Sequence, residues 1–298
     1  MQNVVTVLTP SYNRGSLLDK LYTSLEKQTN KQFEWLIVDD GSTDDTEEIA
    51  KDLIKKASFA ISYTKKKNGG KHTALNVGIK QIKTPLTFIV DSDDYVTEDA
   101  VKTIIDYYEK YKEKNICGFS FLRQFPDGKV NGKMFSPNEV MDTYINRRVN
   151  AGDMDSDKAE VYFTDILLKF PFPEFKDERF LGEDVVWARL SREYQMIHIN
   201  KPIYIGNYLE DGLTRNRRLN NIKSPNGCMV RANEYLHDDV NIRFREKCAL
   251  QYLIYGWFAQ KSFAELLKNA NQKWLVILNI LPAGMLYVRW KKEFEENN

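Results

Sequence analysis

Three aspartates follow one apolar run of the sequence and could together bind a metal ion. Asp91, Asp93 and Asp94 come directly after the run 86–90. Carboxylates at positions i and i+2 of a turn can direct their oxygens toward one point, and Mg²⁺ binds one or two carboxylates together with substrate phosphates. The third carboxylate adds a repulsion that a cation would offset. The alternative is an ordinary turn, in which aspartate is common.

Two further aspartates, Asp39 and Asp40, end a second apolar run at 33–38. A carboxylate in this place can accept hydrogen bonds from a nucleobase or a ribose. The alternative is a cap for the helix that follows, a position where Asp, Ser and Thr are preferred. Because Ser42 or Asp44 can provide that cap, Asp39 and Asp40 are left without a local structural role, and we expect them to bind a ligand.

A third acidic motif, Gly182-Glu183-Asp184, precedes a predicted helix. The dipole and the unpaired N–H groups of a helix N-terminus keep a carboxylate ionised, which suits a general base. Asp184 could equally serve only as the helix cap. Three other side chains are candidates for the same site, two as cationic ligands of a diphosphate and one as a metal ligand, although isolated basic residues are often only structural or solvated: Lys71, Arg215 and His198.

Strand and helix patterns alternate through the first third of the chain. Strands that alternate with helices of this length form βαβ units and a mainly parallel sheet, and such sheets bind ligands at the carboxyl ends of their strands. The predicted fold class is therefore α/β. The predicted strands are 4–9, 33–38, 61–64, 86–90, 118–123 and 196–205, and the predicted helices are 16–28, 43–58, 73–81, 101–111 and 185–193, with helical patterning from about residue 229 onward.

The composition excludes several classes of protein. With 43 Lys and Arg against 42 Asp and Glu, the chain of 298 residues has a net charge of +1, which argues against a bulk electrostatic attraction to nucleic acid. The three cysteines form no C-x-x-C pair, so neither structural zinc nor a disulfide framework is expected. The first residues lack the basic and apolar regions of a signal peptide. We therefore expect a cytoplasmic protein that does not bind nucleic acid.

The motifs, taken in order, resemble those of the inverting glycosyltransferases of family 2, which have the GT-A fold. The resemblance covers residues 3–215 and rests on several segments together rather than on any single one. The segments are Thr9-Pro10-Ser11-Tyr12-Asn13-Arg14, Val38-Asp39-Asp40-Gly41-Ser42-Thr43-Asp44, Asn68-Gly69-Gly70 with Asn76-Val77-Gly78, Val90-Asp91-Ser92-Asp93-Asp94, and Gly182-Glu183-Asp184.

The resemblance implies a GT-A (Rossmann-like), mainly parallel sheet flanked by helices, with a helical C-terminal extension. Residues 1–220 would form the catalytic domain, in which residues 1–112 bind a nucleotide-sugar and residues 113–220 bind the acceptor. Residues 221–298 would form the helical C-terminal region.

The resemblance also implies roles on the donor side. Thr9 and Asp40 would contact the uracil and the ribose of a nucleotide-sugar, with Asp39 beside them. Lys71 would lie near the base or the diphosphate, and Arg215 would help to neutralise the diphosphate.

The metal site implied by the resemblance is the D-x-D pair formed by Asp91 and Asp93. Asp93 would be the direct ligand of Mn²⁺ or Mg²⁺, and Asp91 a further ligand or a contact of the ribose or sugar. His198 follows the helix that begins after Glu183 and Asp184, and is a further candidate ligand.

On the acceptor side, the resemblance implies that Asp184 is the catalytic base and that Glu183 binds the acceptor. The base would remove the proton of the attacking hydroxyl group. A single displacement at the anomeric carbon would invert the configuration of that carbon. The chain lacks the Q-x-x-R-W motif of processive members, which favours transfer of a single sugar. The predicted role is synthesis of a bacterial surface polysaccharide, with a UDP-sugar as donor and a saccharide or lipid-linked saccharide as acceptor.

An apolar segment from Trp274 to Trp290 has two interpretations. It is interrupted by Asn279, Pro282 and Gly284, and falls short of the about 18 apolar residues that a spanning helix requires. Because basic residues flank it, it could lie on a membrane surface as an interfacial anchor, which would place the protein on the inner face of the cell membrane. A pair of helices packed on the catalytic domain is the alternative.

Two other functions are kept as alternatives. One is a catalytically degenerate protein that binds a nucleotide-sugar as a scaffold, but every acidic position expected for catalysis is present. The other is a sugar-1-phosphate nucleotidyltransferase, which would need a Gly-rich basic loop after the first strand, and Thr9–Gly15 offers one glycine and one arginine. A response-regulator-like phosphoacceptor would carry its aspartate pair after the first strand, whereas these pairs follow the second and fourth.

Overall fold

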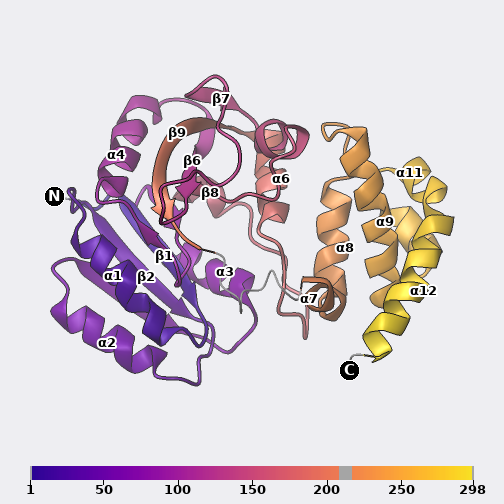
Figure 1. Cartoon of the computed structure of the whole chain (residues 1–298), viewed down its shortest axis with the longest axis horizontal. Helices are drawn as coiled ribbons and strands as arrows, with labels where there is room; N and C mark the ends of the chain where they lie inside the picture. Colours follow the sequence, from indigo (N-terminus) through magenta and orange to yellow (C-terminus); the bar gives the residue numbers. More distant parts are fainter. Residues whose placement is uncertain (1, 208–216, 297–298) are drawn as a thin grey trace.

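The strands of the protein form one sheet, and helices cover both of its faces (Figure 1). The computed structural model describes residues 2–207 and 217–296. Within these residues, nine strands pair in the order β3-β2-β1-β4-β8-β6-β9-β5, with β7 attached to β9. Their bounds are β1 Val5–Ser11, β2 Phe33–Asp39, β3 Ala60–Lys65, β4 Leu86–Ile89, β5 Tyr95–Val96, β6 Ile116–Gln124, β7 Val140–Asp142, β8 Lys158–Phe163 and β9 Gln195–Ile205.

Strands β3, β2, β1 and β4 form a parallel sheet, as the sequence predicts. β1 pairs in parallel with β2 and β4, and β2 pairs in parallel with β3. Every residue of β1 is buried, as is typical of parallel strands that are covered on both faces. Ser11 pairs with Asp39 where β1 and β2 end. The aspartates after β2 and β4 therefore lie at one edge of the sheet, and the predicted α/β fold class is confirmed.

The other half of the sheet is mixed. β8 runs antiparallel to β4 and to β6, whereas β9 runs parallel to β6. The short strand β5 runs antiparallel to β9, with Tyr95 opposite Ile205. This pairing fixes the end of the turn that carries Asp91, Asp93 and Asp94.

Alternate residues of β1 belong to two separate cores, because successive side chains of a strand point to opposite faces. Val5 and Val7 pack with α1, α2 and α4 on one face, whereas Leu8 packs with α3 and α6 on the other. The helices of this part of the chain are the 3-10 turn η1 Gly15–Leu17, α1 Leu18–Glu26, α2 Thr46–Lys56, α3 Lys71–Gln81, α4 Ala100–Tyr111, the π-helical turn η2 Ile145–Asn150, α5 Thr164–Leu167 and α6 Asp184–Glu193.

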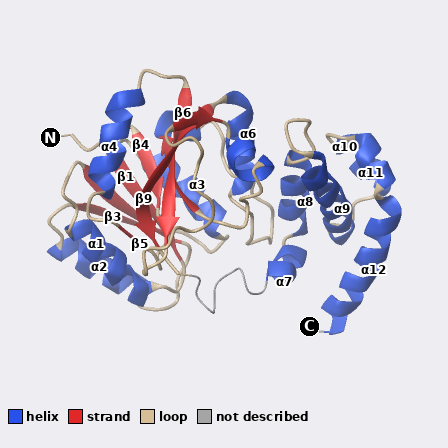
Figure 2. Cartoon of the chain, turned by 45° about the horizontal axis from the view of Figure 1, so that its top comes forward, coloured by secondary structure: helices blue, strands red, loops and turns tan. Residues whose placement is uncertain are grey.

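The C-terminal helices lie together at one side of the sheet (Figures 1 and 2). Helices α8, α11 and α12 pack around α9. Tyr235, Tyr252 and Leu253 belong to the same core as α3 and α6, so these helices extend one face of the sheet. A smaller separate cluster lies among the C-terminal helices and contains Ile222, Cys228 and Tyr255. The predicted domain division at residue 220 stays a prediction. The bounds are α7 Arg217–Lys223, α8 Pro225–Glu234, α9 Ile242–Phe258, α10 Phe263–Asn269, α11 Lys273–Leu278 and α12 Ile280–Glu296.

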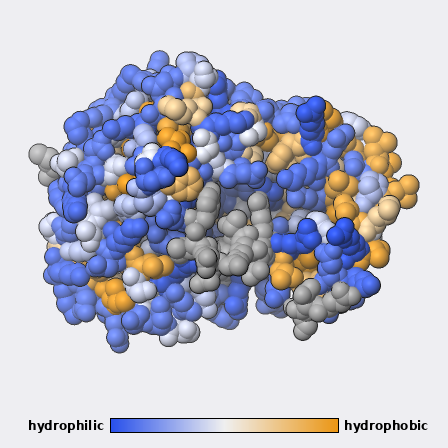
Figure 3. Space-filling model, viewed as in Figure 1, coloured by the Kyte–Doolittle hydropathy of each residue, from blue (hydrophilic) through white to orange (hydrophobic). Residues whose placement is uncertain are grey.

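The apolar segment at 274–290 forms α11 and most of α12, and only part of it is buried. Val276 and Ala283 lie in the core. Leu281 and Met285 are exposed over 78% and 77% of their surfaces. Figure 3 shows apolar surface gathered at the end of the molecule that the C-terminal helices form. No helix within the described residues has both the length and the apolar character needed to cross a membrane.

Candidate active site

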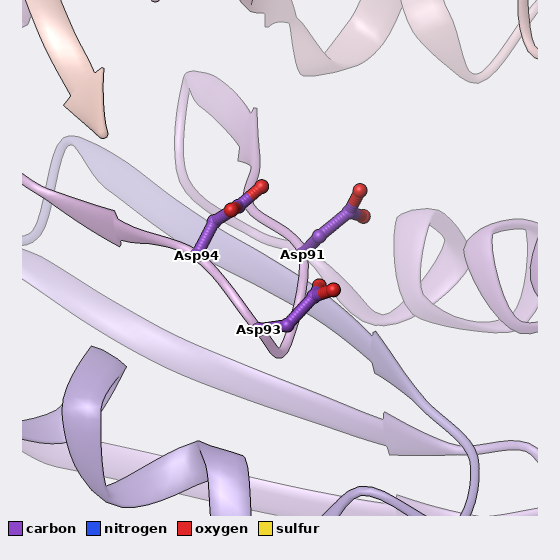
Figure 4. A group of neighbouring side chains, drawn as sticks. All are labelled: Asp91, Asp93 and Asp94. Atoms are coloured by element: carbon purple, nitrogen blue, oxygen red, sulfur yellow. The ribbon is translucent and has the colours of Figure 1, made fainter. Parts of the chain in front are cut away.

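The turn between β4 and β5 gathers three carboxylates (Figure 4). One oxygen from each of Asp91, Asp93 and Asp94 lies within 4.8 Å of the others. Asp94 is buried, whereas Asp91 and Asp93 are partly exposed. The spacing in the sequence predicts that these side chains meet, and the geometry of the turn confirms it.

All three of these carboxylates have partners within the protein, and the partner of Asp91 is Lys71, whose Nζ lies 2.5 Å from Oδ1. Arg14 donates from Nη1 to Asp93 Oδ2 at 2.8 Å. Asp94 accepts hydrogen bonds from Tyr204 Oη at 2.8 Å and from Arg123 Nη2 at 3.2 Å. Burial raises the pKa of Asp94 to about 7, although Arg123 opposes this shift. Negative charge is therefore costly at the buried side of the turn.

The three side chains fit a hard divalent cation. Their ligand atoms are all carboxylate oxygens, which Mg²⁺ and Mn²⁺ prefer. A cation would relieve the repulsion among three neighbouring carboxylates. The side chains of Asp91 and Asp93 are exposed over 39% and 23% of their surfaces, so both are open to a ligand.

Asp39 has two structural partners, which corrects the expectation that it lacks a local role. The side chain is fully buried at the end of β2. Its carboxylate accepts hydrogen bonds from Ser42 N at 2.7 Å and from Tyr63 Oη at 2.5 Å. Burial and the bond to Asp39 raise the pKa of the Tyr63 hydroxyl. These bonds fix the backbone turn that leaves β2.

Asp40 also has a structural role, which corrects the same expectation. It accepts hydrogen bonds from the N–H groups of Gly69 and Gly70 at 3.0 and 2.6 Å. Lys66 Nζ lies 2.7 Å from the same carboxylate. Asp40 therefore ties β2 to the loop before α3. The contacts of Asp39 and Asp40 with a nucleotide stay predictions.

The side chain of Thr9 has a structural partner within the core. Its side chain is fully buried in β1, where Oγ1 accepts a hydrogen bond from Trp35 Nε1 at 2.9 Å. The contact of Thr9 with a uracil stays a prediction. Arg14, the last residue of the motif that begins at Thr9, reaches Asp93.

Lys71 joins the turn after β4 to the acidic motif before α6. Its Nζ lies 2.5 Å from Asp91 Oδ1 and 2.6 Å from Glu183 Oε1. Burial disfavours the ammonium, but the two carboxylates outweigh it and raise the pKa of Lys71. Burial also opposes the charge of Asp91, yet Lys71 lowers the pKa of that carboxyl. At Glu183 burial dominates and raises the pKa.

Close packing against α3 positions the segment that leads to Glu183. Gly70 has a φ of +96°, and a Cβ there would lie 2.1 Å from the carbonyl oxygen of Arg179. Asn76 of α3 donates from Nδ2 to Phe172 O at 2.9 Å and accepts from Phe172 N at 2.9 Å. The glycine and asparagine motifs therefore hold this segment against the sheet edge.

Asp184 begins α6, and residues that follow it by about fifty positions hold its carboxylate. Arg231 of α8 donates from Nε to Oδ1 at 2.8 Å, and its Nη2 lies 2.5 Å from Oδ2. Tyr235 Oη, at the end of α8, donates to Oδ2 at 2.9 Å. Such a two-pronged contact from arginine fixes the plane of a carboxylate. The Asp184 side chain remains exposed over 15% of its surface.

His198 requires a correction, because the structure places it far from the three aspartates. It is fully buried in β9, with Nε2 3.3 Å from the carbonyl oxygen of Asp142 and its ring against Phe135. Along β9 it precedes Ile205, the partner of Tyr95, by roughly 20 Å. Burial lowers the pKa of His198 to about 4. His198 is a neutral core residue, not a metal ligand of this turn.

The remaining expectation concerns Arg215, which lies outside the described residues.

Three contacts of the site were not expected from the sequence: those of Arg14 with Asp93 and those of Arg231 and Tyr235 with Asp184. Arg14 lies in a quoted motif, so its presence at the site has a signal in the sequence. Arg231 and Tyr235 belong to no motif, and only the packing of α8 on α6 reveals them.

The family model of glycosyl transferase family 2 matches residues 6–157, just over half of the chain. The chain belongs to this family. The matched segment includes Lys71 and the aspartates after β4, and it ends before Glu183 and Asp184. The predicted family is therefore confirmed.

Curated glycosyltransferases align with part of the chain. Glycosyltransferase GlyG of Streptococcus pneumoniae is 32% identical over 160 residues, which are 51% of this chain and 52% of GlyG. Poly(ribitol-phosphate) beta-N-acetylglucosaminyltransferase TarS of Staphylococcus aureus is 32% identical over 108 residues, which are 36% of this chain and 19% of TarS. The chain thus matches about half the length of GlyG and a smaller share of TarS.

Solved structures share the fold over nearly the whole chain. S. aureus TarS 1-349 in complex with UDP-GlcNAc has a TM-score of 0.66 at 20% identity, covering 98% of this chain and 80% of that one. The mannosyltransferase PcManGT from Pyrobaculum calidifontis, in complex with GDP-Man and Mn²⁺, has a TM-score of 0.56 at 14% identity, covering 99% and 84%. These similarities support the GT-A type of sheet together with the C-terminal helices.

Proposed function

We propose that this family 2 member transfers one sugar from a nucleotide-sugar, with UDP as the nucleotide, to a hydroxyl group of an acceptor. The transfer inverts the anomeric carbon and uses a divalent cation. The contact of Lys71 with both Asp91 and Glu183 carries the proposal, because it joins a cation-binding turn to a pair of carboxylates. The nucleotide-sugar complexes of TarS and PcManGT, two proteins of similar fold, support the donor class.

The edge of the sheet near Asp91 and Asp93 offers negative groups to a cation and positive groups to the diphosphate of the donor. Asp91 and Asp93 would hold Mn²⁺ or Mg²⁺, which when bound neutralises charge on the leaving diphosphate. Lys71 and Arg14, which pair with these two carboxylates, can also donate to phosphate oxygens. Asp94 would support the turn from its buried side.

Asp184 would accept the proton of the acceptor hydroxyl as that oxygen attacks the anomeric carbon. Arg231 and Tyr235 would act as positioning residues, because their hydrogen bonds orient the Asp184 carboxylate. Attack from the face opposite the diphosphate converts an α-linked UDP-sugar into a β-linked product. Glu183, beside Lys71, would bind the acceptor at the border with the donor.

The test is a thermal-shift and hydrolysis screen of UDP-, GDP- and dTDP-sugars with and without Mn²⁺. A ligand that binds only the folded chain stabilises it by RT ln(1 + [L]/Kd). We expect a Mn²⁺-dependent shift with a UDP-sugar in the wild type that is lost in Asp93→Ala. The matched control is Asp52→Ala, because Asp52 is exposed on α2 away from the site.

Other outcomes of this screen identify the alternatives. A shift without hydrolysis or transfer would indicate a scaffold that only binds nucleotide-sugars. Release of pyrophosphate from UTP and a sugar 1-phosphate would indicate a nucleotidyltransferase. No shift with any nucleotide would contradict the transferase proposal.

The proposed setting is bacterial surface polysaccharide synthesis on the inner face of the cell membrane. The exposed apolar side chains of α11 and α12 support contact with a lipid surface. We expect the chain to sediment with anionic vesicles, and expect the Leu281→Glu and Met285→Glu double variant to stay in the supernatant. A wild-type chain that fails to sediment would remove the membrane part of the proposal.

A further inference from the structure

Glu160 is a charged residue within β8, the strand that lies next to β4 in the sheet. Phe88 of β4 pairs with Val161 of β8 in an antiparallel register, and the same register places Ile89 opposite Glu160. Asp91 follows Ile89 by two residues, a distance of roughly 7 Å along an extended strand. Glu160 therefore lies close to the end of β4, where the cation and the diphosphate of the proposed reaction would bind.

The side chain of Glu160 points to the face of the sheet that α3 and α6 cover. Successive residues of a strand point to opposite faces, so Glu160 shares its face with Tyr162. The ring of Tyr162 stacks on that of Trp187 in α6, with the two centroids 4.3 Å apart. Lys71 begins α3, and Asp184 begins α6. Glu160 therefore lies on the same side of the sheet as Lys71 and the proposed base.

One oxygen of the Glu160 carboxylate has a partner, and the other is open to a ligand. Arg148 donates from Nη1 to Oε1 at 3.4 Å. Arg148 is itself buried, and its guanidinium donates to the carbonyl oxygens of Asp153 and Ser156. Among residues 2–207 and 217–296, no group donates to Oε2 of Glu160, and the side chain is exposed over 16% of its surface. A fixed arginine thus holds a carboxylate that can still accept a hydrogen bond.

Two other carboxylates lie within electrostatic range of Glu160. Burial is the main cause that raises the pKa of the Glu160 carboxyl, Arg148 opposes the rise, and Asp157 and Glu183 add to it. A further anion would be repelled here, whereas hydroxyl groups donate hydrogen bonds to a carboxylate without adding charge. A neutral ligand that carries hydroxyl groups therefore fits this position.

We propose that Glu160 is a specificity-determining residue, which binds hydroxyl groups of the sugar moiety of the nucleotide-sugar and selects a neutral hexose. The inference rests on the proposed function and deepens it, because it names a residue that distinguishes one donor sugar from another. In that reaction the anomeric carbon has to lie between the diphosphate at Asp91 and the base Asp184. Hydroxyl groups of the same sugar then reach the carboxylate of Glu160.

The test compares the binding of UDP with that of UDP-sugars to the full chain, with Mn²⁺ and without an added acceptor. Calorimetry measures the Kd for UDP, UDP-glucose, UDP-galactose and the 2-acetamido derivatives of both sugars. For the UDP-sugar that the wild type binds best, Glu160→Ala should raise the Kd about tenfold or more, as expected for lost hydrogen bonds to a charged group. The Kd for UDP should stay within about twofold of the wild type, because UDP lacks the sugar.

Glu160→Ala should also reduce the difference in Kd between UDP-glucose and UDP-galactose. These two donors differ only in the orientation of one hydroxyl group, and specificity is the difference between two affinities. A purely structural partner of Arg148 would not change this difference.

Two further variants serve as controls. Asp165→Ala removes an exposed carboxylate of α5 and should bind every ligand as the wild type does. Glu160→Gln keeps an oxygen for Arg148, so it should bind the UDP-sugar with a Kd between those of the wild type and Glu160→Ala. If Glu160→Ala fails to bind UDP, the comparison of UDP with UDP-sugars is made with Glu160→Gln.

Three results would overturn the inference. The first is a loss of affinity in Glu160→Ala that is equal for UDP and the UDP-sugars. The second is an unchanged Kd for every UDP-sugar in Glu160→Ala, and the third is equal binding of all four UDP-sugars by the wild type. A wild type that binds no UDP in the presence of Mn²⁺ would contradict the proposed function instead.

Discussion

The carboxyl edge of the parallel strands and the C-terminal helices contribute to the site in different ways. At the edge, Asp40 binds the N–H of Gly70, and the next residue, Lys71, binds Asp91, so short motifs contact one another where neighbouring strands end. The C-terminal helices act through Arg231, which reaches Asp184 from 47 residues further along the chain. The proposed donor side therefore depends on short local motifs, whereas the proposed acceptor side depends on how two parts of the chain pack.

The largest expected effect on activity is at Asp93, in the turn after β4. Asp93→Ala removes one proposed cation ligand and leaves Arg14 without its carboxylate partner. We expect kcat/KM to fall by at least about 100-fold, with a higher Mn²⁺ requirement. Titration of the rate of UDP release with Mn²⁺ measures this effect. A Mn²⁺ dependence equal to that of the wild type would show that the cation is not held at this turn.

A smaller effect is expected at Arg231, which lies in the C-terminal helices and contacts the proposed base, Asp184. Arg231→Gln loosens the Asp184 carboxylate, and misplacement by an ångström lowers kcat by up to about 100-fold. The KM for the nucleotide-sugar should stay unchanged, and Arg231→Lys should recover part of kcat. If both variants instead raised the KM for the donor at constant kcat, Arg231 would belong to the donor side.

Tyr235→Phe tests the same contact with a smaller change. It removes one hydrogen bond to the charged Asp184 carboxylate, and such a bond is worth about 1.5–3 kcal/mol. Because Arg231 still holds the carboxylate, we expect the lower end of this range, a fall in kcat of roughly tenfold, with an unchanged KM for the nucleotide-sugar. A steady-state comparison with the wild type measures it, and an unaltered kcat would confine Tyr235 to a packing role.

The smallest effect on activity is expected at His198, which belongs to neither region. The pKa of about 4 in the folded chain lies below the ordinary value of 6.5. The unfolded chain therefore binds more protons between these values, and stability falls as the pH drops from 6.5 to 4, by at most roughly 3 kcal/mol. Above pH 6.5 this contribution to stability is constant.

Urea unfolding of the wild type and His198→Gln at pH 7, 5.5 and 4.5 measures this slope. The variant should lose less stability on acidification and should keep the Mn²⁺ dependence of the wild type. A Mn²⁺ affinity that falls in His198→Gln would return the histidine to the metal site.

The parallel half of the fold follows from its sequence because two signals agree there. Apolar runs such as 33–38 alternate with amphipathic helices, and aspartates mark the strand ends. The spacing of Asp91 and Asp93 suffices to predict a shared turn. The mixed half of the sheet carries no such rule, because the antiparallel pairing of β4 with β8 joins segments far apart in the chain.

The positions of individual side chains follow less directly from the sequence, because successive residues of a strand point to opposite faces. Thr9 points into the core toward Trp35, although it begins a motif at the sheet edge. His198 follows the helix that begins at Asp184, yet β9 carries it away from the turn. Arg231 has no motif at all, since its role arises only from the packing of α8 against α6.

The most direct test of the account compares Asp184→Asn with Glu183→Gln in the full chain. Binding of the UDP-sugar that gives the largest thermal shift, with Mn²⁺, is measured by calorimetry, and slow release of UDP with water as acceptor measures the chemistry. We predict that Asp184→Asn binds within about twofold of the wild type, while UDP release falls by about 100-fold or more. Glu183→Gln should keep most of the hydrolysis. Hydrolysis at the wild-type rate in Asp184→Asn, or its loss only in Glu183→Gln, would contradict the account.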